Sequence, residues 1–193
     1  VGMKPAHMDF ARGVFDYGDW GDEWFVTENK PLMLRSDGTV DYYLDPNDYT
    51  RNVNGTQSDV ANTGYDGNAM AQFPLVWVKR YEDENYYYEV ISNVQYDEDY
   101  KAYAHTRADG TIADFFYHSL FGATNVKMSD GTYKLRSISE LKQDDGINRG
   151  VRIERARANG SRWYIGTWSQ HELIRTLLVL MGKSVDTQGT FGT

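Results

Sequence analysis

The chain has 193 residues, no cysteine, and a formal net charge of −8 from 20 Lys and Arg against 28 Asp and Glu. The length predicts one domain, with or without a short arm, and the lack of cysteine excludes disulfides, thiolate nucleophiles and cysteine-ligated metal sites. The negative charge argues against nucleic acid and anionic membrane surfaces as partners, and no apolar run is long enough for insertion as a spanning helix.

The first 30 residues are predicted to be an N-terminal arm or linker, and residues 31–193 a single domain whose C-terminal part could extend beyond Thr193. Trp20 and Trp24 lie in a glycine-rich stretch of this arm, where either ring could dock on the domain or on a neighbouring chain. Aromatic residues form 15% of the chain. Because these residues favour strands, we expect a β-rich domain.

Asp-Gly pairs mark the predicted turns. The first lies in the tetrapeptide at residues 36–39, between apolar segments at 32–35 and 40–44, and predicts a hairpin. Asp-Gly supplies the positive φ angles that a two-residue hairpin turn requires. Similar tetrapeptides stand at 108–111 and 129–132, and their unequal spacing indicates a recurring turn rather than a repeat architecture.

The middle of the chain is predicted to hold a long loop and a second hairpin. Residues 45–72 are rich in turn-forming residues with little apolar periodicity, which indicates a loop. Residues 73–81 and 85–92 are predicted to be paired strands. Since both faces of this pair carry apolar residues at the centre, we expect the hairpin to lie in the interior.

A helix and a strand are predicted after residue 140. Asp144 or Asp145 is a suitable N-cap for a helix that runs to about Ala158 and stops at Asn159-Gly160. Residues 162–166 then predict a strand. Trp163 in this strand and Trp168 after it are both expected to pack the next helix onto the sheet.

A second helix is predicted close to the C-terminal end of the chain. Ser169 followed three residues later by Glu172 has the pattern of a capping box. The helix is expected to end at Gly182. Its apolar stripe consists of Leu173, Leu177, Leu180 and Met181. With the hairpins, the two helices predict an α+β domain.

No motif predicts catalysis or a cofactor. The four histidines lack metal-ligand spacing, and the acidic clusters at 83–84 and 97–99 do not match a calcium loop, so that solvated acidic loops are the expected reading. We therefore expect no metal, no cofactor and no enzymatic activity. A glycosidase-like carboxylate pair stays open, because its spacing is spatial rather than sequential.

Tyr96, Tyr100 and Tyr103 are the candidate ligand-binding residues, in a segment that interleaves aromatic and acidic side chains. An amphipathic ring can stack on the face of a sugar or anchor a protein interface. The alternative is that these tyrosines are half-buried strand residues whose hydroxyl groups meet water.

Several segments, in this order, resemble passages of bacteriophage tail and tail-fibre structural proteins. Residues 186–192, for example, resemble the N-S-Q…G-x-G close of that family. The other matching segments are 66–74, 76–79, 87–92, 105–110, 135–137, 152–158, 160–168 and 177–178. The resemblance implies a C-type-lectin-like domain, with antiparallel β-hairpins braced by two helices, related to the variable proteins of diversity-generating retroelements. The related formylglycine-generating enzymes use cysteine or thiolate-held metal, which this chain lacks.

The resemblance implies a virion tail protein, outside the cell, that displays a receptor-binding surface on a rigid scaffold. Its expected partners are a host-surface glycan or protein, other virion tail proteins, and further copies of itself, by family habit as a trimer. Two alternatives stay open. One is a purely structural tail or baseplate component, and the other is a hydrolase acting on surface polysaccharide.

Overall fold

The computed structural model describes residues 2–143 and 146–192. It contains about 19% helix and 32% strand in antiparallel sheets, which confirms the predicted α+β class. The described chain forms two compact units. The first comprises Val1–Glu28, Pro74–Phe116 and Thr167–Thr193, and the second Asn29–Phe73 and Tyr117–Gly166. In the part of the chain that the structure describes, no helix is both long and apolar enough to cross a bilayer.

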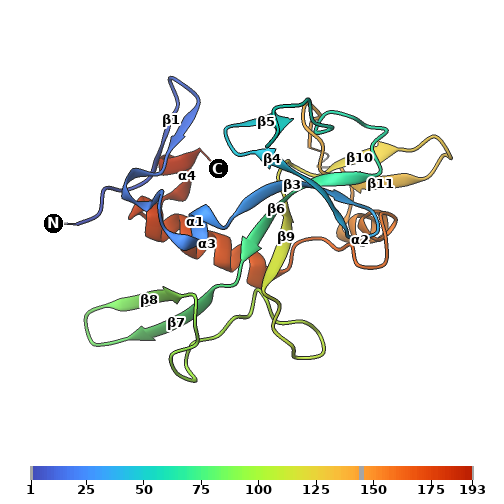
Figure 1. Cartoon of the computed structure of the whole chain (residues 1–193). Coiled ribbons are helices and arrows are strands. Elements are labelled where there is room, and N and C mark those ends of the chain that lie inside the picture. The colour runs from blue at the N-terminus through green and yellow to red at the C-terminus, as the bar shows by residue number, and fades with distance from the viewer. Residues whose placement is uncertain (1, 144–145, 193) are drawn as a thin grey trace. The chain divides into compact units, whose positions relative to one another are not determined.

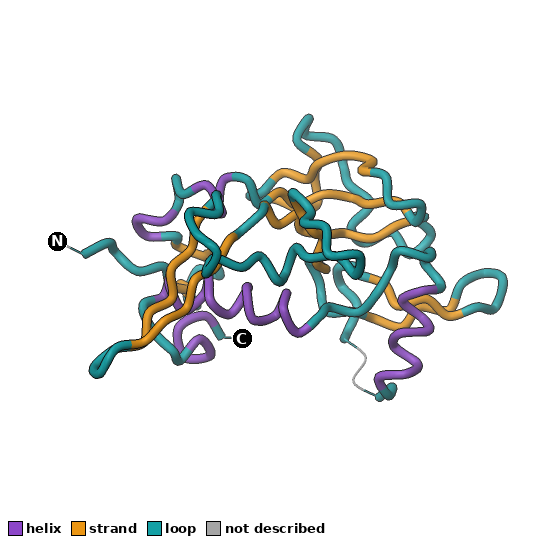
Figure 2. Tube along the Cα trace, turned by 90° about the horizontal axis from the view of Figure 1, so that it is seen from below, coloured by secondary structure: helices purple, strands orange, loops and turns teal. Residues whose placement is uncertain are grey.

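A five-stranded sheet, in the order β5-β4-β3-β6-β9, organises the second unit (Figure 1, Figure 2). Its strands are β3 (Lys30–Arg35), β4 (Val40–Asp45), β5 (Asp48–Asn52), β6 (Gly67–Pro74) and β9 (Phe115–Ser119). The central strand β3 pairs antiparallel with both β4 and β6. Leu32, for example, lies opposite Tyr43 on one side and Met70 on the other.

Both faces of this sheet are covered. Leu32 and Leu34 pack with Met70 on one face, and Met33 packs with Leu44 on the other. Since neighbouring residues of a strand point to opposite faces, the four consecutive buried residues of β3 reflect this two-sided burial. The half-buried Trp163 contributes to the first of these clusters.

The three Asp-Gly tetrapeptides adopt one shared turn, which confirms the first predicted hairpin and corrects its turn type. At residues 35–39, the Gly38 N–H donates to the Arg35 carbonyl and the Arg35 N–H to the Thr39 carbonyl, both at 2.9 Å. Only Gly38 has a positive φ, +87°. The connection is therefore a three-residue loop with one left-handed glycine, not a two-residue turn. Equivalent bonds close residues 107–111 and 128–132.

The prediction of a loop over residues 45–72 is wrong, because β5 and most of β6 lie within it. Strand β6 begins with Gly67, Asn68 and Ala69, which have low strand propensity and short side chains. All three are nevertheless buried beside β3. A Cβ atom at Gly67 would overlap the carbonyl oxygen of Leu34. Close backbone packing, which leaves no periodic signal, therefore selects these small residues.

A fully buried arginine fastens the start of β6. Arg136 ends β11 (Tyr133–Arg136), which pairs with β10 (Thr124–Lys127). Its guanidinium donates to Asn68 Oδ1 at 3.2 Å, to the Tyr65 carbonyl at 2.6 Å and to the Gly67 carbonyl at 2.5 Å. Burial lowers the pKa of Arg136 from its usual value. Hydrogen bonds to neutral acceptors thus compensate a buried charge.

Helix α2 (Arg149–Arg157) is shorter than predicted. Its N-cap is Asn148, whose side chain accepts from the Val151 N–H at 3.0 Å, and the predicted caps Asp144 and Asp145 lie outside the described residues. The predicted stop is confirmed, because the helix ends before Asn159-Gly160. The Asn159 side chain then donates to the Leu135 carbonyl at 2.8 Å and so joins this turn to β11.

The predicted strand over residues 162–166 is wrong, because this segment is irregular. Trp163 lies there instead with its indole N–H donating to the Ser36 carbonyl at 2.8 Å. The ring therefore packs on the five-stranded sheet of the second unit. The prediction placed it against the C-terminal helix, which belongs to the first unit.

Helix α3 (Trp168–Gly182) is the longest helix of the first unit, and its apolar stripe is confirmed for Leu173, Leu177 and Met181. The capping box lies two residues earlier than predicted. Thr167 accepts from the Gln170 N–H at 3.3 Å, and the Gln170 side chain accepts from the Thr167 N–H at 3.0 Å. The predicted cap Ser169 is part of the helix, and the left-handed residue at its end is Lys183.

The second predicted hairpin is present in the first unit as β7 (Trp77–Glu82) and β8 (Tyr87–Ser92). Its pairing is confirmed, but its interior position is wrong, because the two strands form a sheet of their own and their outer halves are exposed. Phe73 and Pro74, predicted to start this strand, belong to β6.

The N-terminal residues carry regular structure in the first unit. They form β1 (His7–Asp9), β2 (Val14–Asp16), the 3₁₀ helix η1 (Gly18–Trp20) and α1 (Trp24–Thr27). The Ala6 N–H donates to the Met181 carbonyl of α3 at 2.8 Å. Phe15 stacks on Phe191 of α4 (Thr187–Phe191), with 5.4 Å between ring centroids.

Candidate functional site

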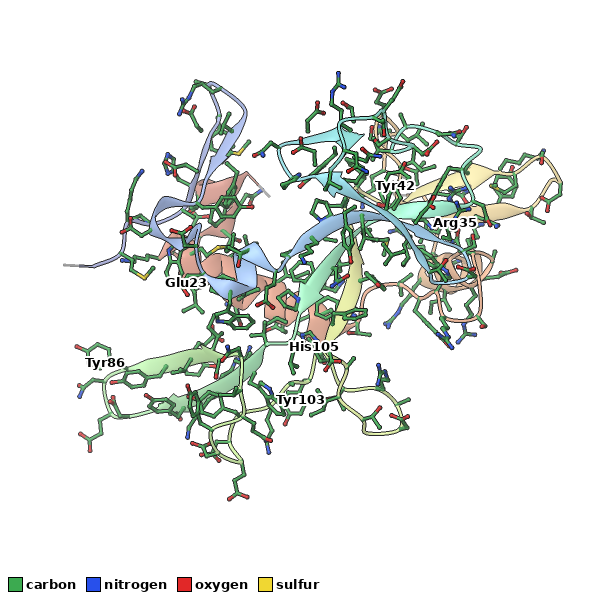
Figure 3. All side chains as sticks on the ribbon, in the orientation of Figure 1. Glu23, Arg35, Tyr42, Tyr86, Tyr103 and His105 are labelled. Atoms are coloured by element: carbon green, nitrogen blue, oxygen red, sulfur yellow. The ribbon has the colours of Figure 1, made fainter. Side chains whose placement is uncertain are left out.

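The first unit contains a groove of about 930 Å³ between the β7–β8 hairpin and α3. We call it the aromatic groove, after the rings that line it. Figure 3 labels Tyr86 at the far end of the hairpin and Tyr103 nearer to its base. The lining residues that matter here are the aromatic Tyr87, Tyr88, Tyr103 and Trp168, the charged Arg80, Glu89, Lys101, Glu172 and Arg175, and the apolar Val76, Val78, Leu173, Val179, Leu180 and Val185.

Exposed rings line the aromatic groove. The exposed fractions are 77% for Trp168, 64% for Tyr103 and 61% for Tyr87. The prediction that Trp168 packs a helix onto the sheet is therefore wrong. Trp168 is the first residue of α3, and its position just after the cap points the ring away from the buried stripe. Large rings left in water at a hollow are a common feature of ligand-binding surfaces.

Tyr88 is held in place by its neighbours on the hairpin. Its ring stacks on Tyr81 at 4.6 Å between centroids, with 10° between the ring planes. Its hydroxyl donates to Asp83 Oδ2 at 2.8 Å, and this hydrogen bond raises the pKa of Tyr88. The aromatic groove therefore has one ring with a set orientation beside others that stand free.

Charged residues tie the hairpin to the helix beneath these rings. Arg80 Nε lies 2.8 Å from Glu89 Oε1, and Arg80 Nη2 donates to the fully buried Thr176 of α3 at 3.0 Å. The Thr176 hydroxyl in turn donates to Glu89 at 3.4 Å. This network fixes the distance between the two walls, so that the aromatic groove does not depend on a bound molecule for its shape.

Buried His105 supports the wall that contains Val76. The Val76 N–H donates to His105 Nε2 at 3.3 Å, and the ring lies 4.9 Å from that of Phe116. Burial lowers the pKa of His105 to about 4, so the imidazole is neutral at pH 7. An accepting Nε2 places the proton on Nδ1, and a backbone contact with Ala113 partly offsets the lowering of the pKa. His105 is therefore a supporting residue and no proton donor at neutral pH.

The structure separates the three predicted tyrosines. Tyr103 lines the aromatic groove. Tyr96 and Tyr100 form an edge-to-face pair, 5.9 Å between centroids, outside that lining. Lys79 bridges to Asp97 at 2.9 Å and to Asp99 at 3.0 Å and lies 5.6 Å from the Tyr100 ring. These ion pairs fold residues 96–100 into a loop, so the three rings do not share one strand face.

Sequence reasoning missed Tyr87, Tyr88 and Trp168. The run Tyr86-Tyr87-Tyr88 was a usable signal, because three successive rings in a strand cannot all be buried on one face. Trp168 had no comparable signal. A Trp beside a helix start is compatible with packing as well as with exposure, and only the position of the cap decides between them.

A second hollow of about 470 Å³ adjoins the aromatic groove, with which it shares Val179, Leu180 and Val185. Met3, Trp20 and Lys183 complete its lining together with Ser184. In the described ranges no three His, Asp or Glu side chains are grouped as metal ligands. Comparison of the chain with protein-family models, with curated proteins and with solved structures finds no match.

Proposed function

We propose that the chain is a binding module that attaches to a carbohydrate receptor through the aromatic groove. The observation that carries this proposal is the set of exposed rings, Tyr87, Tyr103 and Trp168, around an open hollow whose walls are braced by buried polar contacts. The apolar face of a sugar stacks on such rings, while its hydroxyl groups bond to charged side chains such as Lys101 and Glu172.

The biological setting that we propose is a virion tail with a C-type-lectin-like scaffold, and it rests on the sequence resemblance alone. The binding surface suits that setting, since a shallow groove gives each copy a weak site. Several copies on one particle raise the overall avidity by orders of magnitude without any new contact.

A structural tail or baseplate component is the second candidate. The exposed fraction of Val185, at 83%, and that of Trp168 favour it, because a neighbouring virion protein would bury both. A hydrolase is less well supported. Glu89 and Glu172 line the same groove, but each is engaged by an arginine, at 2.8 Å and 3.8 Å.

The test is binding of the purified chain to a glycan array, followed by affinity measurements on the best ligand. Trp168→Ala and Tyr103→Ala are each expected to weaken binding about tenfold or more, because a central aromatic anchor contributes on the order of 2 kcal/mol. Tyr86→Ala and Tyr96→Ala are the matched controls. Their rings are as exposed, at 67% and 74%, but lie outside the groove lining, and we expect changes below about twofold.

Equal losses in all four variants would contradict a role for the aromatic groove. Absence of binding to any glycan, together with capture of a tail protein that depends on Trp168, would favour the structural candidate. Release of reducing sugar from a bound polysaccharide, abolished by Glu172→Gln, would favour the hydrolase.

A further inference from the structure

Positive charge is concentrated in one part of the second unit. Residues 117–166 contain nine of the 20 Lys and Arg of the chain but five of the 28 Asp and Glu. Within them, residues 149–162 contain five arginines and one glutamate. A chain with a net charge of −8 therefore has a segment of the opposite sign, which its average charge conceals.

These arginines differ from the ion-paired basic residues of the chain in their partners. Seven Lys and Arg side chains elsewhere lie within 4.0 Å of a carboxylate, namely Lys4, Arg12, Arg35, Arg51, Lys79, Arg80 and Arg175. Arg149, Arg155, Arg157 and Arg162 have no such partner among residues 2–143 and 146–192. We call these four residues the arginine surface.

Two members of the arginine surface are held over tyrosine rings. The guanidinium carbon of Arg155 lies 4.8 Å from the Tyr133 ring centroid, and that of Arg157 lies 4.9 Å from the Tyr164 centroid. Arg157 Nη2 also approaches the Tyr164 hydroxyl at 3.5 Å. Stacking restricts the guanidinium but leaves donors along its edge for a second partner.

The backbone brings this set together at one end of the second unit. Helix α2, which carries Arg149, Arg155 and Arg157, packs against β11, which carries Tyr133 (Figure 1). A turn closed by Gly160 N–H to the Arg157 carbonyl, at 2.9 Å, then leads to Arg162. Arg149, Arg157 and Arg162 are exposed. Arginines in the last helical turn also complement the helix dipole, but this role uses none of the edge donors.

We propose that the arginine surface binds an acidic polysaccharide through its carboxylate groups. Guanidinium and carboxylate match in a planar, two-pronged hydrogen bond, and the three exposed members, Arg149, Arg157 and Arg162, which have no carboxylate partner among the described residues, supply several such positions. Duplex nucleic acid is the less suitable polyanion. Its charge density is very high, so the net negative charge of the chain opposes its approach more strongly than that of a polysaccharide with fewer charges per unit length. The site is separate from the aromatic groove, so the two proposals succeed or fail independently.

The test is affinity electrophoresis of the full chain through gels that contain polygalacturonate, with neutral dextran as the reference, at about 50 mM salt, where screening is weak. The triple variant R149Q/R157Q/R162Q is expected to bind about tenfold more weakly than the parent chain. The control R12Q/R35Q/R51Q removes three ion-paired arginines and lowers the net charge by the same amount. It is expected to bind within about twofold of the parent.

Arg157→Lys keeps the charge and loses the planar fork, so an intermediate loss is expected. If circular dichroism shows that the triple variant is unfolded, this single substitution still tests whether the arginine surface binds polygalacturonate. Three results would overturn the proposal: no retardation of the parent chain by polygalacturonate, equal weakening in both triple variants, or stronger binding to duplex DNA than to polygalacturonate.

Discussion

The two units of the chain differ in how many aromatic rings they expose and in the charge of the polar groups that they bury. In the second unit, polar side chains such as Arg136, Asn68 and Asn159 are buried and hydrogen-bonded beneath a five-stranded sheet. In the first unit, a two-stranded hairpin and a helix leave Tyr87, Tyr103 and Trp168 in water. A broad sheet can cover its polar groups, whereas a narrow hairpin cannot cover its rings, and those rings are then available to a ligand.

The charged residues are also distributed unequally between the two units. The first unit has 17 Asp and Glu against eight Lys and Arg, and the second has 11 against 12. Most ion pairs of the described residues lie in the acidic first unit or around β4 and β5 of the second. The average charge of the whole chain therefore describes neither unit. A surface of opposite sign is found only when the units are considered separately.

The largest expected effect is the loss of the buried arginine of the second unit. Arg136→Met removes the donors that satisfy the Tyr65 and Gly67 carbonyls and the Asn68 side chain. We expect the free energy of unfolding to fall by about 3 kcal/mol, because buried acceptors lose their partners. Urea denaturation of the variant and of the parent chain measures this change in the free energy of unfolding. Arg51→Met, an exposed arginine of the same unit, should change it by less than about 0.5 kcal/mol.

A result in which the two arginine variants are equally stable would break the comparison between the units. The second unit would then tolerate the loss of its buried polar network as readily as the loss of a surface pair.

The next effect concerns the buried histidine of the first unit. The pKa of His105 is lowered to about 4 by burial, against a usual value of about 6.5 in an unfolded chain. The unfolded state therefore binds more protons between these pH values, and stability falls as the pH drops from about 6.5 to 4. The loss is about 3 kcal/mol. Urea denaturation at pH 7 and at pH 4 measures it.

His105→Gln is the matched variant, because its amide oxygen can still accept from the Val76 N–H. The difference in stability between pH 7 and pH 4 should shrink by about 3 kcal/mol in this variant. Parallel pH profiles for the parent chain and His105→Gln would show that His105 is not desolvated in the folded chain.

The smallest expected effect concerns the three Asp-Gly turns. It tests whether the stability of such a turn depends on the unit that contains it. Gly38, Gly110 and Gly131 have φ angles of +87°, +83° and +84° and open space where a Cβ would lie. Each change to Ala should cost about 1 kcal/mol in thermal or urea unfolding, because left-handed backbone disfavours a Cβ. Gly21→Ala, at an ordinary negative φ of −60°, should cost nothing.

A cost at Gly110, in the first unit, that differed by more than about 1 kcal/mol from the cost at Gly38 and Gly131 would mean that the surroundings dominate the turn. Similar costs at the three glycines would mean that the two units do not differ in their local turns. The difference between the units would then lie in packing and charge.

Prediction from the sequence succeeded where a feature depends on residues close together in the chain. The positions of the Asp-Gly turns, the β7–β8 pairing and the stripe of α3 all have their determinants within a few residues. Prediction failed for β6, whose small residues are selected by contact with β3 and Arg136. It failed again for Trp168, where a shift of the cap by two residues decides exposure.

The candidate sites show the same limit. Tyr103 was identified as a ligand-binding residue from its acidic and aromatic surroundings and does line the aromatic groove, but Tyr96 and Tyr100 fold away with Lys79. The carboxylate partners of the arginines could not be predicted from the sequence either. An acidic residue that is close in the sequence does not have to be close in the folded structure.

By itself, the order of residues determined the α+β class, the positions of the turns and the apolar face of α3, because backbone propensities and short-range hydrogen bonds act over a few positions. The tertiary structure alone decided which rings face water, which arginines stay without a carboxylate and how the chain divides into two units. Those outcomes depend on contacts between residues far apart in the chain, such as Arg136 with Gly67 and Arg80 with Thr176, and no local pattern encodes them.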